Sequence, residues 1–90
     1  MINPASNNDD PLTVALHALA VTIRDERRAE RLLDLSGIAP ADLRERADDP
    51  QLLSAVLRFL EAHEPDLLAV AAELGRKPEE LVAARSALEA

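Results

Sequence analysis

Proline residues divide this chain into short segments. Five of its six prolines each precede a run of apolar residues at helical spacing, and these are Pro11, Pro40, Pro50, Pro65 and Pro78. Proline is tolerated at the first position of a helix, because the N–H group that it lacks would have no partner there. The pattern therefore predicts an all-α fold: a compact bundle of five or six short helices that meet at proline and glycine corners.

The first predicted helix follows Asp10, which we expect to be its N-cap. No glycine or proline interrupts the chain from there to Gly37, so one long helix would be allowed. The apolar positions change phase after Ile23, however, and a continued first stripe would bury charged residues. We therefore predict a break near residues 24–25, with Asp25 as the N-cap of a second helix that ends at Gly37.

The helix that Pro50 begins is predicted to be the centre of the fold. Its polar side chains form one narrow stripe, which consists of Gln51, Ser54, Arg58 and Glu61. All its other positions are apolar, and a helix that is apolar around most of its circumference is buried on several sides. We therefore expect this fourth helix to be central, with Val56 and Phe59 almost fully buried.

Composition limits the classes of function. The 90 residues suffice for one domain, and we expect a flexible tail over residues 1–9 and a single helical domain over residues 10–90. The absence of cysteine excludes disulfides and thiolate metal sites, and no targeting segment is recognisable, so we expect a cytoplasmic protein. The net charge of −7 disfavours nucleic acids and membranes as partners, and the longest apolar stretch is too short to span a bilayer.

Three segments resemble those of a known family. Residues 32–44 read LLDLSGIAPADLR and are similar to the family segment FLxLTGLxPxDLR. Residues 53–60 read LSAVLRFL and resemble its segment FLxAVLDFL, and residues 67–85 resemble its closing pair of helices. Over residues 16–88 the chain thus resembles the bacterial small all-helical family catalogued as domain of unknown function 3572. It departs from the pattern in lacking an aromatic residue in the first helix and a proline between the first two helices. The resemblance implies a helical fold and no catalytic residues, since the family has no established activity.

Arginines of the second helix form a candidate partner-binding surface, which consists of Arg24, Arg27, Arg28 and Arg31. They share an arc of about 100° if that helix starts near residue 24. Such a group could hold an acidic partner or a phosphate, because guanidinium groups bind oxyanions in a forked manner. Acidic residues are interleaved with the arginines, however, and this favours a solvated face of ion pairs between neighbouring turns.

The first helix has two apolar sides. The stripe that we expect to face the core consists of Leu12, Ala15, Leu16, Leu19 and Ile23. A second strip, on roughly the opposite side, consists of Val14, Ala18 and Val21. Either the helix is enclosed on both sides within one chain, or this strip contacts another chain, as it would in a homodimer.

The corner around Gly75 has the spacing of a DNA-binding helix–turn–helix, with Ala71 before the turn and Leu81 after it. The helix that would enter the groove presents Glu79 and Glu80, whose charge opposes contact with phosphates. We therefore favour a structural corner, and keep a degenerate helix–turn–helix regulator with weak or no DNA binding as the alternative.

Nothing in the chain has the pattern of a catalytic site. His17 and His63 are the only histidines, and the sequence His63-Glu64 lacks the second histidine of a zinc motif. No catalytic triad order, phosphate loop or dinucleotide fingerprint occurs. We therefore predict no enzyme activity, no cofactor and no metal, and expect a non-catalytic protein-interaction module whose partner is another protein or a second copy of the chain. An enzyme that uses His63 with neighbouring carboxylates is a third, less favoured alternative.

Overall fold

The computed structural model describes residues 10–90, and these residues contain six helices and no strand. The helices are α2 (Pro11–Arg24), α3 (Glu26–Ser36), α4 (Pro40–Glu45), α5 (Pro50–Ala62), α6 (Glu64–Leu74) and α7 (Pro78–Glu89). The prediction of an all-α bundle is confirmed, whereas the expected tail over residues 1–9 lies outside the described residues. None of the described helices has the length and apolar character needed to cross a membrane.

Prolines and caps account for most helix starts. Four helices begin with a proline, and α6 begins one residue earlier than predicted, at Glu64, with its proline in the second position. The side chain of Asp10 accepts a hydrogen bond from the N–H of Thr13 at 3.1 Å. The side chain of Asp49 likewise accepts one from the N–H of Gln51 at 2.9 Å. Each carboxylate satisfies an N–H group that the first turn of a helix leaves without a partner.

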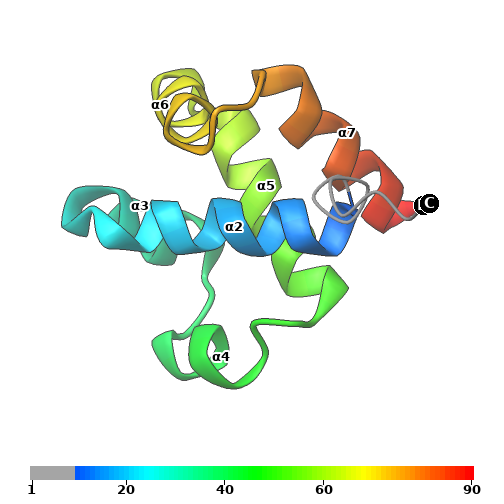
Figure 1. Ribbon diagram of the computed structural model, residues 1–90. Helices are drawn as coiled ribbons and strands as arrows, with labels where there is room; N and C mark the ends of the chain where they lie inside the picture. Colours follow the sequence, from blue (N-terminus) through cyan, green and yellow to red (C-terminus); the bar gives the residue numbers. More distant parts are fainter. Residues whose placement is uncertain (1–9) are drawn as a thin grey trace.

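The predicted break between the first two helices is confirmed at Asp25. Its backbone is extended, with φ −100° and ψ 116°, so α2 ends there. Its carboxylate then accepts hydrogen bonds from the N–H groups of Arg27 at 2.9 Å and Arg28 at 3.2 Å. One residue thus ends α2 and caps α3, and the chain changes direction between them (Figure 1).

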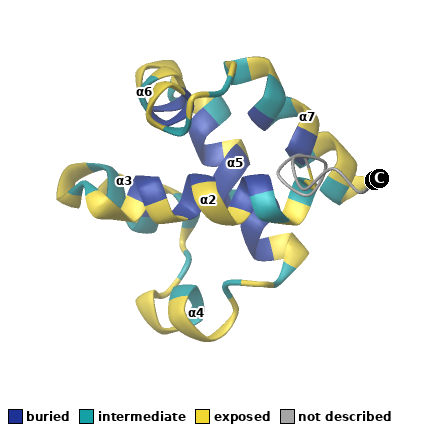
Figure 2. Cartoon of the chain, in the orientation of Figure 1, coloured by how far each residue is buried: buried dark blue, intermediate teal, exposed yellow. Residues whose placement is uncertain are grey.

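Helix α5 is central, as predicted. It crosses behind α2 in Figure 1 and packs against α2, α3, α6 and α7. Val56 and Phe59 are buried, and most of the helix carries the colour of buried residues in Figure 2. Ser54 belongs to the predicted polar stripe, yet it is buried too, and its hydroxyl is satisfied by a hydrogen bond that it donates to Glu89 of α7.

The inward side of α2 differs from the prediction. Val14, Ala18 and Val21 are no more than 5% exposed and belong to the core of the single chain. They are buried because α2 packs against α5, α6 and α7 at once, and these helices cover that side of it. Of the two alternatives for this strip, enclosure within one chain is therefore confirmed, and its use as a strip for contact with another chain is wrong.

The stripe of α2 that was predicted to face the core is divided. Ala15 and Leu19 are buried, whereas Leu12, Leu16 and Ile23 are 40%, 42% and 45% exposed. Since α2 is apolar around most of its circumference, apolar spacing does not determine which side packs inward. A small side chain such as Ala15 lets a neighbouring helix approach closely, which favours the observed orientation.

Helix α4 stands apart from the other helices, at the bottom of Figure 1. None of its residues is buried, and it is attached through partly buried side chains on and beside it, namely Ile38, Leu43 and Ala47. Gly37 allows the turn that leads to this helix, because its φ of 75° is a conformation that costs other residues energy. The α4 segment therefore covers little of the surface of α2.

Candidate functional site

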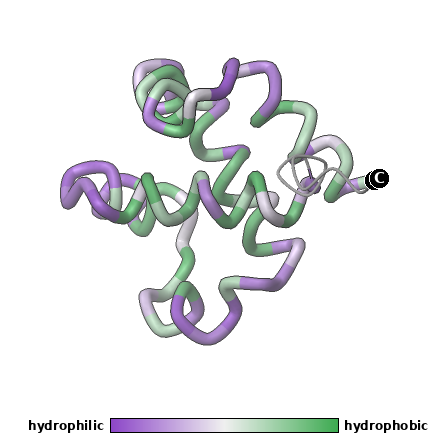
Figure 3. The backbone as a smooth tube through the Cα atoms, in the orientation of Figure 1, coloured by the Kyte–Doolittle hydropathy of each residue, from purple (hydrophilic) through white to green (hydrophobic). Residues whose placement is uncertain are grey.

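Three exposed apolar side chains form a row along α2. Leu12, Leu16 and Ile23 are separated by four and seven residues, so they lie within an arc of about 40° on one side of the helix. At 1.5 Å per residue the row is about 16 Å long. We call these three residues the outer row. Figure 3 shows the hydrophobic character that extends along this helix.

The outer row differs from other exposed apolar residues. Within residues 10–90, five large hydrophobic side chains are exposed, and three of them form the row; the other two are Leu35 on α3 and Leu68 on α6. No charged side chain occurs from Pro11 to Ile23, although 30% of the residues in the chain are charged. A single exposed leucine is ordinary, whereas an aligned, uncharged group is typical of a surface that contacts another molecule.

Three of the four arginines in the predicted partner-binding surface form ion pairs with acidic residues of α6. Arg24 and Arg28 both pair with Glu73, with N–O distances of 3.2 and 2.9 Å. Arg28 also reaches the carboxylate of Asp25 at 3.5 Å. The pKa of Asp25 is lowered, chiefly because the N–H group of Arg28 donates to its carboxylate. These arginines are engaged in contacts between helices, and their acidic partners include a residue far along the chain.

Arg31 makes a forked contact of the same kind. Its Nη2 and Nε atoms donate to the two carboxylate oxygens of Asp66, at 2.7 and 3.2 Å. The pKa of Arg31 is raised, chiefly by this hydrogen bond. Arg27 is exposed on α3. Arg24, Arg28 and Arg31 thus form their ion pairs chiefly with α6, rather than between neighbouring turns of one helix.

A polar cluster that was not anticipated joins α5 to α7. Glu89 accepts hydrogen bonds from Ser54, from Arg58 at 2.6 and 2.7 Å, and from Arg85 at 2.8 Å. The contacts with Arg58, followed by that with Ser54, lower the pKa of Glu89 to about 2. Arg85 also pairs with Glu61. Three members of the cluster belong to the predicted polar stripe of α5, which was the only signal for it in the sequence.

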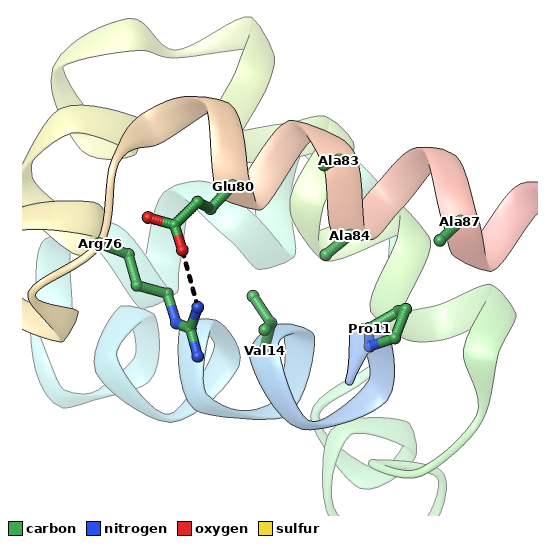
Figure 4. Close-up of a pocket in the computed structure, with 7 residues that line it drawn as sticks. All are labelled: Pro11, Val14, Arg76, Glu80, Ala83, Ala84 and Ala87. Atoms are coloured by element: carbon green, nitrogen blue, oxygen red, sulfur yellow. Dashed lines mark hydrogen bonds and ion pairs between the residues drawn. The ribbon is translucent and has the colours of Figure 1, made fainter. Parts of the chain in front are cut away.

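A hollow of about 450 Å³ lies between the start of α2 and α7 (Figure 4). Pro11, Val14 and three alanines of α7 line it, and an ion pair of 2.9 Å between Arg76 and Glu80 stands at one end. The pKa of Glu80 is lowered, chiefly by the N–H group of Lys77. The hollow thus has a largely apolar lining with one ion pair at its end.

The histidines are placed apart. His17 is exposed on α2, whereas His63 ends α5, with its Nδ1 atom 2.9 Å from the carbonyl oxygen of Phe59. Its ring stacks on that of Phe59 at a centroid distance of 4.7 Å. Across residues 10–90, no three histidine or acidic side chains are grouped closely enough to hold a metal ion. His63 thus has a structural contact at the end of a helix.

The corner between α6 and α7 has the form expected from its spacing. Gly75 adopts the left-handed conformation that ends α6, and Ala71 and Leu81 are buried on either side of the turn. Glu80 accepts a hydrogen bond from the N–H of Lys77 at 2.8 Å and also pairs with Arg76. One of the basic side chains at the corner is therefore already held by a carboxylate.

The comparisons with known proteins agree with the sequence pattern. No curated protein and no solved structure matches the chain. All three segments that resemble the helical family lie inside the range of a family match, which confirms that resemblance. That match is to the family described as "Protein of unknown function (DUF3572)" and spans residues 8–90, nearly the whole sequence, so the chain belongs to this family.

Proposed function

We propose that this protein is a non-catalytic protein-interaction module that binds its partner through the outer row of α2. The observation that carries the proposal is the 40–45% exposure of Leu12, Leu16 and Ile23 on a helix side without charged residues. Apolar surface gains about 25 cal/mol per Å² when it leaves water. A row of this kind therefore gains free energy when another protein covers it.

The helices around α2 make the outer row a suitable binding surface. The opposite side of α2 is held by α5, α6 and α7, so the row is presented on a supported helix. A partner that binds it need not order a loop, which reduces the entropic cost of association. The row could bind an apolar groove or the apolar side of another helix.

A helix–turn–helix regulator is the alternative, and the α6–α7 corner is what favours it. The charge of the chain argues against it, because duplex binding needs several free cations and the net charge is −7. Arg76 is also paired with Glu80 at this corner. We expect no sub-micromolar affinity for duplex DNA at physiological salt, as measured by fluorescence anisotropy.

Capture from the native cell extract tests the proposed surface. We expect the tagged protein to retain a partner that Leu16→Glu loses, because the new carboxylate would have to be buried without a counter-charge. Leu68→Glu is the matched control, since it makes the same change at an exposed leucine of α6. Circular dichroism checks that both variants remain folded. Equal retention by Leu16→Glu and the unchanged protein would rule out the outer row.

A further inference from the structure

We infer that the partner of the outer row is a second copy of this chain, bound in a two-fold contact between antiparallel α2 helices. The inference rests on the proposed function, because it assigns a partner to the same row. It is carried by the charges at the two ends of α2, by the order of large and small side chains along it, and by the charge of the whole chain.

Charge selects this side of the molecule for self-contact. In a two-fold contact each surface meets its own copy, so a charged patch meets like charge. The net charge is −7, and residues 47–90 carry nine acidic side chains against four basic ones. From Pro11 to Ile23 there is no charged side chain at all. A two-fold contact through this stretch of α2 therefore brings no like charges together along the helix.

The ends of α2 favour the antiparallel direction. Asp10 is exposed immediately before the helix. Arg24 is the last residue of the helix, and its side chain remains 68% exposed although it pairs with Glu73. When two copies of α2 run in opposite directions, Asp10 of each copy lies near Arg24 of the other. A parallel contact would instead place the two Asp10 carboxylates together and the two Arg24 guanidinium groups together. The dipoles of the two helices also favour opposite directions.

The large and small side chains along α2 are spaced so that they fit against a second α2 that runs in the opposite direction. A two-fold axis between residues 17 and 18 places Leu12 opposite Ile23 of the second copy. The same axis places Leu16 near Ala20 of the second copy, and Ala20 is small and exposed. A large side chain thus meets a small one at the centre, while large side chains meet at both ends. Such alternation lets helices pack closely.

The contact is small, which predicts a weak dimer. Three side chains that are each less than half exposed bury an area at the low end of specific interfaces. We therefore expect a dissociation constant on the order of 10–100 μM. The protein should be largely monomeric when dilute and dimeric when concentrated.

Sedimentation velocity over a range of concentrations tests for the dimer. We expect the unchanged protein to shift from the mass of one chain to that of two. Leu16→Glu should stay monomeric, with self-association weakened at least about tenfold, because the two-fold axis brings two carboxylates into an apolar contact. Leu68→Glu adds the same charge away from α2 and should dimerise as the unchanged protein does. Ile23→Gln provides a second test if Leu16→Glu loses its helical signal.

Cross-linking tests the direction of the helices. The chain has no cysteine, so one introduced cysteine is its only thiol. Thr13→Cys and Ala20→Cys flank the outer row and leave its three side chains intact. In the antiparallel contact these positions meet each other, so a mixture of the two variants should be linked by mild oxidation. Thr13→Cys alone should link poorly, because its two copies lie about 14 Å apart along the helices.

The outcomes separate the inference from the proposed function. One outcome is that the unchanged protein stays monomeric at high concentration and still captures another protein that Leu16→Glu does not capture. That result would overturn the inferred dimer and support the outer row as a binding surface. Dimerisation of Leu16→Glu with unchanged strength shows that the dimer uses another surface and overturns the inference. Efficient linking of Thr13→Cys to itself overturns the antiparallel direction. If Leu16→Glu changes neither self-association nor capture, both the inference and the proposed function are wrong.

Discussion

At the scale of single residues, Phe59 is the largest apolar side chain in the core. It is the only aromatic residue, it is 6% exposed, and it stacks on His63. We expect Phe59→Ala to lower the free energy of unfolding by about 3–5 kcal/mol, through lost burial and the cavity left behind. Urea unfolding measures this change. Leu68→Ala is the control at an exposed position, and an equal midpoint for the two variants would contradict the central position of α5.

The contacts of Glu89 with Arg58 and Ser54 should make the stability of the protein sensitive to acid. Its folded-state pKa is depressed from 4.5 to about 2, so its ionised form is stabilised by the folded state. That contribution is present above pH 4.5 and is lost as the pH falls toward 2. We expect Glu89→Gln to be less stable than the unchanged protein at neutral pH. The difference should shrink between about pH 4.5 and pH 2, because the protonated carboxyl resembles the amide.

Urea unfolding at several pH values measures this dependence for Glu89. Other acidic groups titrate in both proteins, so only the difference between the two free energies of unfolding reports on Glu89. Glu26→Gln, at an exposed position of α3, is the control. A difference between the unchanged protein and Glu89→Gln that stays constant down to pH 2 would mean that the Arg58 and Ser54 contacts do not favour the ionised form.

At the scale of helices, Asp25 separates two elements that the chain could otherwise join. Its carboxylate accepts hydrogen bonds from two N–H groups of α3. We expect Asp25→Ala to lower the free energy of unfolding by about 1 kcal/mol, the usual cost of losing an N-cap side chain. Asp34→Ala, at an exposed position later in α3, should lower it much less. Equal stability of Asp25→Ala and the unchanged protein in urea would show that the cap is not needed for the break.

The helix boundaries could be predicted from the sequence, whereas the packing of α2 could not. Prolines and caps act within a turn or two, so local residues suffice to place Asp25, Gly37 and the helix starts. The inward side of α2 depends instead on where α5, α6 and α7 lie, and its apolar residues surround the helix. Spacing therefore placed Leu16 in the core and could not decide whether Val21 is enclosed, whereas in the structure Leu16 is exposed and Val21 is buried.

The charged residues of the ion pairs could be recognised in the sequence, whereas their partners could not. The arginines at the end of α2 and along α3 were visible as a group, and so was the polar stripe of α5. Their partners, among them Glu73, Asp66 and Glu89, lie 24 to 49 residues away along the chain. Only the fold brings these groups together. The outer row was likewise present in the sequence as apolar residues, but its exposure is a property of the assembled bundle.

At the scale of the whole molecule, net charge and the outer row act in opposite directions on self-association. Each copy carries a net charge of −7, so two copies repel one another at long range. The row itself is uncharged, and the exposed pair of Asp10 with Arg24 of the other copy is expected to contribute little. Salt screens the repulsion over about 10 Å at 0.1 M and leaves the apolar contact intact.

We therefore expect added sodium chloride to strengthen the dimer, so that the concentration needed for half-dimerisation falls as salt rises. Sedimentation velocity at low and at high salt measures this change, and Leu16→Glu, expected to be monomeric at both, is the control. The direction of the effect is informative in itself. An interface held by ion pairs loses affinity when salt is added, because its attractive charges are screened. A dimer that dissociates at high salt would therefore be held by charged contacts outside the outer row, whereas one that tightens is held by the apolar side of α2.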